Sequence, residues 1–169
     1  MKKVWIMTAI LVAGTSLAVT AKRFPNLKLS GLEKGELSRE TIKGKVTIVN
    51  LWATWCEACK VELKEMEHVF SKLKSNENFS FAMVTLDKDP EKAVEWIKEN
   101  LKRPSEALAQ SYKDPEFSLA EKFSDDTFPV TLVVDQKGDV VKVYEGFEEG
   151  SNQTEEMANL VKKILAKAQ

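Results

Sequence analysis

Hydrophobic residues alternate between strand-like runs and helix-like stripes from residue 46 to residue 101. Residues 46–52 form a nearly continuous apolar run rich in β-branched side chains, which predicts a strand buried on both faces. Apolar residues then recur at steps of three and four, which predicts an amphipathic helix with the stripe Leu63, Met66, Phe70 and Leu73. Residues 79–86 predict a second buried strand. A further helix opens at Pro90, and its apolar side contains Val94, Ile97 and Leu101.

The C-terminal part of the chain predicts a strand hairpin followed by a last helix. Residues 131–135 form a third apolar strand, and a turn at Gly138 leads into residues 140–144, whose alternation suits an antiparallel partner at the sheet edge. The stripe of the final helix contains Met157, Leu160, Val161, Ile164 and Leu165. This order of elements predicts an α/β domain with a central mixed β-sheet flanked by α-helices.

Two regions have weaker patterns. Residues 24–45 are polar and punctuated by glycine and proline, which predicts a short hairpin before the core, and Ser38 is placed to cap a brief helical turn. In residues 102–127, two prolines interrupt the pattern, and residues 116–123 indicate one short helix.

Residues 1–21 have the pattern of a bacterial export signal. Two lysines precede an apolar run over residues 4–19, and small residues follow it. The run also approaches the length of about 17–25 residues that spans a bilayer. A cleaved signal peptide and a retained membrane anchor therefore both fit. Either form places residues 22–169, which have the length of one domain, outside the cytoplasm.

Composition and charge exclude several classes of protein. The chain of 169 residues is 43% apolar and 30% charged, so it is neither a disordered segment nor a disulfide-dense scaffold. Its formal net charge is −1, which argues against a surface that binds phosphates or nucleic acid. The two cysteines, Cys56 and Cys59, are too few for a disulfide framework or a four-cysteine zinc site.

The cysteine pair lies where the strand at residues 46–52 ends and the following helix begins. Free backbone N–H groups and the positive end of the helix dipole stabilise a thiolate at such a place, so we predict Cys56 as the nucleophile. Cys59 lies one turn deeper on the apolar stripe. It is therefore the shielded thiol that resolves a mixed disulfide formed at Cys56.

Other interpretations of the pair need residues that the sequence lacks. A zinc site needs a second pair of ligands, and the one histidine is His68. Covalent haem needs a histidine directly after Cys59, where Lys60 stands. A purely structural disulfide closing so short a loop adds little stability. We therefore predict redox exchange at the two cysteines, with no metal and no cofactor.

Glu62 is a third candidate catalytic residue. It lies three residues after Cys59 on the same helix face, at the margin of the apolar stripe. Burial there would raise its pKa and allow it to exchange protons with Cys59. The spacing fits equally well a solvated Glu62 that pairs with Lys60 or Lys64.

Other side chains flank the pair in the sequence. Glu57 places negative charge near the thiolate and opposes its ionisation, which favours a reductant. Trp52 and Trp55 flank an exposed thiol, so we expect them to wall its approach, although both also suit a core. We expect His68 at the surface or at the edge of the core.

Two segments resemble a known group of proteins. They are residues 43–60, with Trp-Ala-Thr-Trp-Cys-Glu-Ala-Cys at 52–59, and residues 128–135, which read Phe-Pro-Val-Thr-Leu-Val-Val-Asp. Together with Glu62 they are similar to the TlpA/ResA-like group of extracytoplasmic thioredoxin-fold proteins, over residues 24–169. The resemblance implies a thioredoxin-like domain over residues 22–169, with an N-terminal hairpin extension.

The resemblance also implies roles for individual residues. Pro129 would be the cis-proline that faces the cysteines, and Phe128 would offer its backbone to a substrate strand. Glu62 would be the active-site glutamate of the family. Three positions depart from the common pattern: Ala58 and Lys64 stand where many members have proline, and Phe128 is bulkier than usual.

These residues predict a monomeric thiol-disulfide oxidoreductase in the periplasm or on the outer face of the inner membrane, which reduces disulfides in partner proteins. The resemblance implies a membrane thiol transporter as electron donor and substrates such as apocytochrome c. A disulfide oxidant or isomerase remains open, and so does a copper-delivery module on the same fold. The copper-delivery proteins that share this fold have a longer spacing between their cysteines and a distant histidine. This sequence has neither feature.

Overall fold

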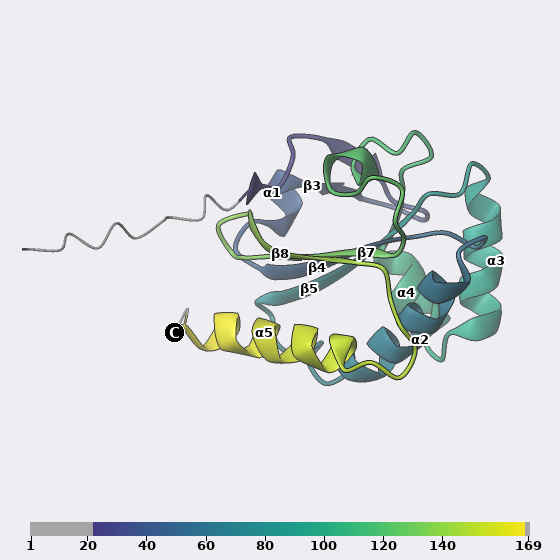
Figure 1. Cartoon of the computed structure of the whole chain (residues 1–169). Coiled ribbons are helices and arrows are strands. Elements are labelled where there is room, and N and C mark those ends of the chain that lie inside the picture. The colour runs from purple at the N-terminus through teal and green to yellow at the C-terminus, as the bar shows by residue number, and fades with distance from the viewer. Residues whose placement is uncertain (1–21, 168–169) are drawn as a thin grey trace, which may run out of the picture.

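The structure, a computed structural model, describes residues 22–167 (Figure 1). Its elements in chain order are β1 (Lys22–Arg23), β2 (Lys28–Ser30), β3 (Glu36–Ser38), α1 (Arg39–Ile42), β4 (Val46–Trp52), α2 (Glu57–Phe70), β5 (Phe79–Thr85), α3 (Pro90–Asn100), α4 (Pro104–Ala109), β6 (Ser111–Lys113), the 3₁₀ helix η1 (Ala120–Lys122), β7 (Val130–Val134), β8 (Asp139–Glu145) and α5 (Gln153–Lys167). The expected export segment, residues 1–21, lies outside the described residues. Within residues 22–167, no helix combines the length and the apolar character needed to cross a membrane.

Six strands form one mixed sheet in the order β1-β8-β7-β4-β5-β6. Strand β4 is parallel to β5 and antiparallel to β7, and β7 and β8 form an antiparallel hairpin. Strands β2 and β3 form a separate two-stranded hairpin near the N-terminal end of the described chain. The mixed sheet, the antiparallel last strand pair and the N-terminal hairpin that the sequence predicts are therefore confirmed.

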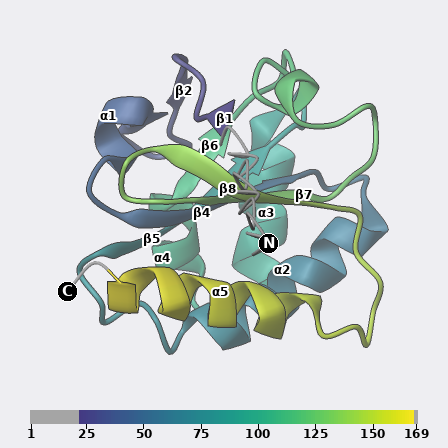
Figure 2. The ribbon, with the colours of Figure 1, turned by 60° about the vertical axis from the view of Figure 1, so that its left-hand side comes forward.

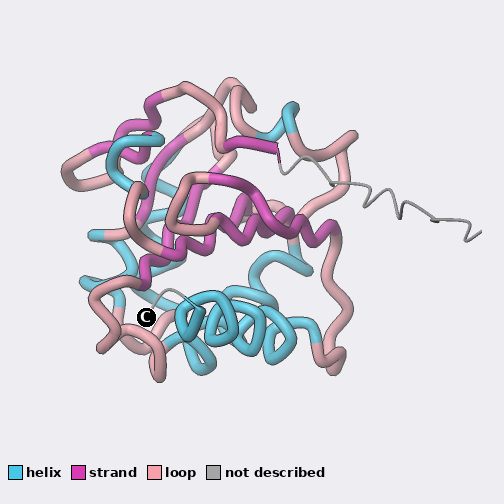
Figure 3. Tube along the Cα trace, turned by 90° about the vertical axis from the view of Figure 1, so that its left-hand side faces the viewer, coloured by secondary structure: helices cyan, strands magenta, loops and turns pink. Residues whose placement is uncertain are grey.

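Strand β4 lies at the centre of the core because both of its faces are apolar. All seven of its residues are buried. Val49 and Leu51 pack on the face covered by the β2–β3 hairpin and α1. Ile48 and Trp52 point to the other face, which the longer helices cover. Figure 1 shows α2 and α5 on one side of the sheet and α1 with β3 on the other, and Figure 3 shows the strands as the middle layer.

Helix α2 follows the predicted apolar stripe, with Leu63, Met66 and Phe70 buried against the sheet. Leu73 is also buried, in the turn that follows the helix. The last helix, α5, lies beside α2 on the same face of the sheet (Figure 2). This arrangement brings the start of α5 close to the first turns of α2, where the cysteines are.

Residues 102–127 differ from the expected pattern. Pro104 begins helix α4, because a proline fits the first turn, where its missing N–H has no partner to lose. Strand β6 pairs in parallel with β5. The sequence does not predict β6, because a strand of three residues is too short to show an alternating pattern. The helix expected over residues 116–123 is reduced to the 3₁₀ turn η1.

The expected edge position of β8 is also wrong in part. The short strand β1 pairs with its first residues, Lys22 with Val140 and Arg23 with Asp139. Two charged residues at the start of the described chain give no hydrophobic alternation, so the sequence does not reveal this outer strand.

Candidate active site

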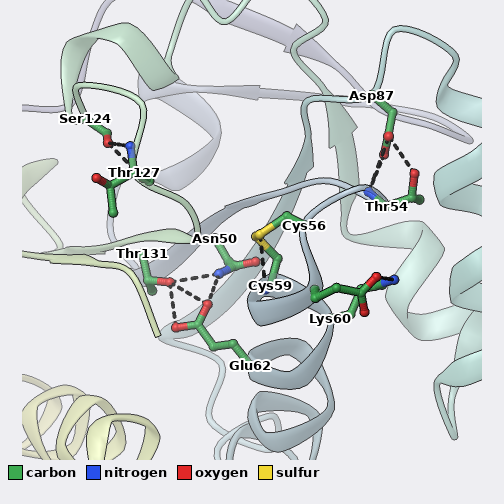
Figure 4. The surroundings of a disulfide bond; sticks show 11 residues. Asn50, Thr54, Cys56, Cys59, Lys60, Glu62, Asp87, Ser124, Thr127 and Thr131 are labelled. Atoms are coloured by element: carbon green, nitrogen blue, oxygen red, sulfur yellow. Dashed lines mark hydrogen bonds and ion pairs between the residues drawn. A yellow bond between two sulfur atoms is a disulfide. The ribbon is translucent and has the colours of Figure 1, made fainter. Parts of the chain in front are cut away.

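The two cysteines form a disulfide at the junction between β4 and α2 (Figure 4). The S–S distance is 2.04 Å. Cys56 is the N-cap residue of α2, and its Sγ accepts a hydrogen bond from the backbone N–H of Cys59 at 3.2 Å. The sequence-based placement of Cys56 at the first helical turn is therefore confirmed.

The two sulfur atoms have different access to solvent. Cys56 is half-buried, whereas Cys59 is fully buried and packs with Trp52 and Leu63. Unpaired N–H groups and the helix dipole at the start of α2 stabilise negative charge on the outer sulfur. A partner can therefore reach Cys56, and Cys59 lies directly behind it for an intramolecular attack.

A loop with a cis-proline lies beside the cysteine pair. The peptide bond between Phe128 and Pro129 is cis. Phe128 packs on the same core cluster as Cys56, and its ring meets Trp55 edge to face, with 5.9 Å between centroids. The ring of Phe117 also meets the ring of Phe128 edge to face, with 6.2 Å between centroids. The structure thus brings Trp55, Phe128 and Pro129 together around Cys56, as expected.

The two tryptophans near the cysteines occupy different environments. Trp55 is 57% exposed, the larger exposure of two exposed large hydrophobic side chains among the described residues. Trp52 is fully buried and packs against Trp96, with 5.1 Å between ring centroids. The expectation that Trp52 walls the approach to the thiol is therefore wrong, because its strand position points it into the core.

Glu62 is fully buried one turn after Cys59 and is held by three polar side chains. Asn50 on β4 donates from Nδ2 to Glu62 Oε2 at 2.7 Å. Thr131 on β7 donates from its hydroxyl to Glu62 Oε1 at 3.3 Å. Gln153, at the start of α5, donates from Nε2 to Oε1 at 3.3 Å. Side chains from β4, β7 and the start of α5 therefore converge on this carboxylate of α2, and Figure 4 shows the contacts of Asn50 and Thr131.

Burial raises the pKa of Glu62 from 4.5 to about 7. Desolvation is the main cause, because a charged carboxylate loses its hydration in the core. The hydrogen bonds from Asn50, Gln153 and Thr131 oppose this and lower the pKa, while the nearby charge of Glu65 raises it slightly. Glu62 therefore changes its protonation state near neutral pH, where it can accept or release a proton.

The alternative of a solvated Glu62 paired with a lysine is wrong. Lys60 forms its ion pair with Glu57 instead. Lys64 lies over the ring of Trp96, at 5.7 Å from its centroid. Because Glu57 is paired with Lys60, its negative charge is partly compensated, which weakens the effect on the thiolate that the sequence predicts.

The sequence pattern does not reveal the residues that hold Glu62. Asn50 offers the clearest signal, since it is a polar residue inside the apolar run of β4 and is fully buried. Thr131 is an ordinary strand residue, and nothing in the pattern around Gln153 connects it with residue 62. Their shared function depends on contacts across 69 and 91 residues of sequence.

A second buried carboxylate supports the segment before Cys56. Asp87, two residues after the end of β5, accepts a hydrogen bond from the Thr54 hydroxyl at 2.7 Å and another from the Thr54 backbone N–H at 3.0 Å. The hydroxyl of Thr85 donates to the same carboxylate at 2.7 Å. The contact was not expected from the sequence, although an acidic residue shortly after a buried strand is a recognisable signal. Asp87 fixes the turn that presents Trp55 and Cys56.

Metal-binding geometry is not found in the part of the chain that the structure describes. No group of three or more His, Cys, Asp or Glu side chains within residues 22–167 is arranged to hold an ion. His68, the one histidine, is exposed on α2, in agreement with the expected surface position.

The mixed sheet, the half-buried and fully buried cysteines of one short disulfide, and the neighbouring cis-proline are the features of thioredoxin-like redox proteins. The chain belongs to the Redoxin family, whose sequence model matches residues 20–161. The resemblance to the TlpA/ResA-like group is confirmed by this match and by the relatives below.

The curated relatives match the chain over part of their length. Thiol-disulfide oxidoreductase ResA of Bacillus thuringiensis is 31% identical over 68 residues, which cover 40% of this chain and 38% of ResA. Thiol:disulfide interchange protein DsbE of Escherichia coli is 28% identical over 85 residues, covering 48% of this chain and 43% of DsbE. The matched stretch therefore spans less than half the length of either relative.

Solved structures share the fold. A thiol:disulfide interchange protein of the thioredoxin family from Chlorobium tepidum superposes with a TM-score of 0.66 at 22% identity, covering 86% of this chain and 97% of that one. A thiol-disulfide oxidoreductase from Bacteroides fragilis gives a TM-score of 0.66 at 22% identity, covering 82% and 99%. The thioredoxin-like fold that the sequence predicts is therefore confirmed.

Proposed function

We propose that this chain is an extracytoplasmic thiol-disulfide oxidoreductase that reduces disulfide bonds in partner proteins. The observation that carries the proposal is the Cys56–Cys59 disulfide, with its outer sulfur accessible and its inner sulfur fully buried. The relatives named thiol-disulfide oxidoreductase and thiol:disulfide interchange protein support the same chemistry.

The reaction begins with the reduced protein. The Cys56 thiolate attacks one sulfur of the partner's disulfide, forms a mixed disulfide and releases the partner's other sulfur as a thiolate. The Cys59 thiol gives its proton to the Glu62 carboxylate and attacks the Cys56 sulfur. This step forms the Cys56–Cys59 disulfide and releases the second partner sulfur. The partner gains two electrons, and this protein loses two.

The side chains around Cys56 bind and orient the partner in this proposal. Trp55 and Phe128 form an aromatic surface beside the reactive sulfur. The backbone of Phe128, ahead of the cis-proline Pro129, is placed to pair with an extended segment of the substrate. Extended peptides suit this mode of binding because their backbone N–H and C=O groups have no intramolecular partners.

In this proposal the compartment rests on the N-terminal sequence, and the source of electrons rests on the resemblance to the TlpA/ResA-like group. Residues 1–21 have the pattern of an export signal or anchor, so the dithiol works in an oxidising compartment. It must be reduced again after each cycle. A membrane thiol transporter supplies the electrons in this proposal, and apocytochrome c or another protein with a metal-binding dithiol is the substrate.

A trapping experiment tests the proposed reaction. Cys59→Ser leaves the attacking sulfur without its resolving partner, so we expect mixed disulfides with exported proteins, which reducing agent releases and mass spectrometry identifies. Cys56→Ser is the matched control and traps none. The wild-type dithiol should also reduce insulin. Failure of Cys59→Ser to trap any protein, together with absence of insulin reduction, would refute the proposal.

The reduction potential tests the direction of electron flow. A value of about −270 mV or lower supports a reductant, whereas a value near about −120 mV indicates an oxidant of partner dithiols. The measurement uses equilibration with glutathione or dithiothreitol buffers of known ratio.

A further inference from the structure

The side-chain amide of Asn50 is only half satisfied in the disulfide form. Asn50 is fully buried on β4, and its Nδ2 donates to Glu62 Oε2 at 2.7 Å and to the Thr131 hydroxyl oxygen at 2.8 Å. Its Oδ1 is buried and has no hydrogen-bond partner. A buried acceptor without a donor is destabilising, because it has lost its hydration and gained no hydrogen bond in return. Buried polar atoms normally have a hydrogen-bond partner, so the unpaired Oδ1 needs an explanation.

The orientation of this amide is fixed by its neighbours. While Glu62 is ionised, its carboxylate only accepts hydrogen bonds, so the nitrogen of Asn50 has to face it. Turning the amide over would remove its two bonds and place Oδ1 against the carboxylate oxygen. The oxygen of Asn50 is therefore held on the side away from Glu62.

The free oxygen is directed toward the cysteine pair. Figure 4 shows Asn50 between the disulfide and Glu62, with its nitrogen toward the carboxylate and its oxygen toward the sulfur atoms. Cys59 and Glu62 lie three residues apart on the same face of α2, and both are fully buried. A disulfide sulfur carries no proton. The oxygen therefore has no donor on that side while the protein is oxidised.

We propose that Asn50 is a positioning residue that recognises the reduced state, with its Oδ1 accepting a hydrogen bond from the Sγ–H of Cys59. This inference rests on the proposed redox function. Reduction by a donor dithiol breaks the S–S bond, adds two electrons and leaves a proton on the buried Cys59 sulfur. That proton supplies the donor that Oδ1 lacks in the disulfide form.

The bond has two consequences for the reaction. It stabilises the dithiol relative to the disulfide, because Oδ1 is satisfied only after reduction. It also fixes the Cys59 thiol next to Glu62, since one amide contacts both groups. Asn50 thus keeps the Cys59 thiol, which donates the proton, beside the Glu62 carboxylate, which accepts it, from one reaction cycle to the next.

Substitution of Asn50 tests the effect on the redox equilibrium. Asn50→Leu has a similar size and no acceptor, so we expect its equilibrium with glutathione to shift toward the disulfide by about tenfold, or about 30 mV for a two-electron couple. Thr47→Val is the matched control. It removes another buried oxygen without a partner from the same strand, at a position that faces the opposite side of the sheet. Its equilibrium should stay within twofold of the wild type, and an equally small shift for Asn50→Leu would overturn the inference.

A vibrational measurement tests the hydrogen bond directly and needs no redox activity. The chain has two cysteines, so Cys56→Ser leaves the Cys59 thiol as its single S–H group. We expect its infrared S–H stretch at a lower frequency than that of an unbonded thiol, and a return to the unbonded frequency in Cys56→Ser/Asn50→Leu. An unbonded frequency in Cys56→Ser itself would refute the role of Asn50. Trapping by Cys59→Ser reports separately on the proposed function, so the two failures are distinguishable.

Discussion

The Nδ2 atom of Asn50 lies 2.7 Å from Oε2 of Glu62, so strand β4 and helix α2 are joined by a buried hydrogen bond beside the cysteine pair. This contact places an ionisable group in a region without solvent. Its protonation state therefore depends on the fold itself, and several measurable properties follow from that dependence.

The stability of the oxidised protein should fall as pH rises because of Glu62. Its pKa is raised from 4.5 to about 7 on folding, so the folded chain binds a proton that the unfolded chain has released. The resulting stabilisation is complete below pH 4.5 and is lost as pH rises through about 7. It amounts to about 3 kcal/mol in the free energy of unfolding.

Urea unfolding at a series of pH values measures this effect. The wild type should lose about 3 kcal/mol of stability between pH 5 and pH 8, and Glu62→Gln should not show this loss. Glu95→Gln, which changes an exposed glutamate on α3, should keep the wild-type profile. Parallel profiles for wild type and Glu62→Gln would contradict the raised pKa.

The hydrogen bond from Gln153 should hold the pKa of Glu62 down. Gln153→Met keeps the length of the side chain and removes the donor to Oε1, so we expect the pKa of Glu62 to rise above about 7. Titration of the ¹³C-labelled Glu62 carboxyl group by NMR measures the change. Asn152→Ala alters the exposed neighbour and should leave the titration curve in place. A lower pKa in Gln153→Met would show that the bond does not favour the charged form.

Loss of the Asp87 carboxylate should destabilise the turn before Cys56. Asp87→Asn keeps the shape of the side chain but weakens its bonds to the Thr54 and Thr85 hydroxyls, and we expect a loss of about 1.5–3 kcal/mol in chemical denaturation. Asp125→Asn, an exposed change, should cost less than about 0.5 kcal/mol. Equal stabilities of the two variants would show that the buried carboxylate does not anchor the turn.

Trp55 should contribute to the recognition of protein substrates. Trp55→Ala removes an exposed ring that packs on Phe128 beside Cys56, so we expect kcat/KM for insulin reduction to fall about tenfold, which corresponds to about 1.4 kcal/mol. Reduction of a small disulfide, hydroxyethyl disulfide, should change much less. Val141→Ala alters the other exposed large hydrophobic side chain among the described residues, on β8, and should leave both rates unchanged. An unchanged insulin rate in Trp55→Ala would remove Trp55 from the substrate surface.

The sequence by itself determined the features that depend on residues close together in the chain. The apolar run of β4, the stripe of α2 and the two cysteines between them define the strand, the helix and the position of each sulfur. Helical geometry fixes the relation of Cys56 to Cys59 through an offset of three residues. The pattern of neighbouring residues is therefore enough to assign Cys56 as the exposed cysteine and Cys59 as the buried one.

Only the tertiary structure decided the surroundings of Glu62. The spacing left a buried acid and a solvated ion pair open, and the choice depended on β7 and α5, which bring Thr131 and Gln153 to the carboxylate. The side-chain oxygen of Asn50 is likewise recognised as unpaired only when every neighbouring donor is placed. Hydrophobic periodicity reports which face of an element is buried. Solvation and hydrogen bonding of a polar group depend on how distant elements pack, because its partners come from separate parts of the chain.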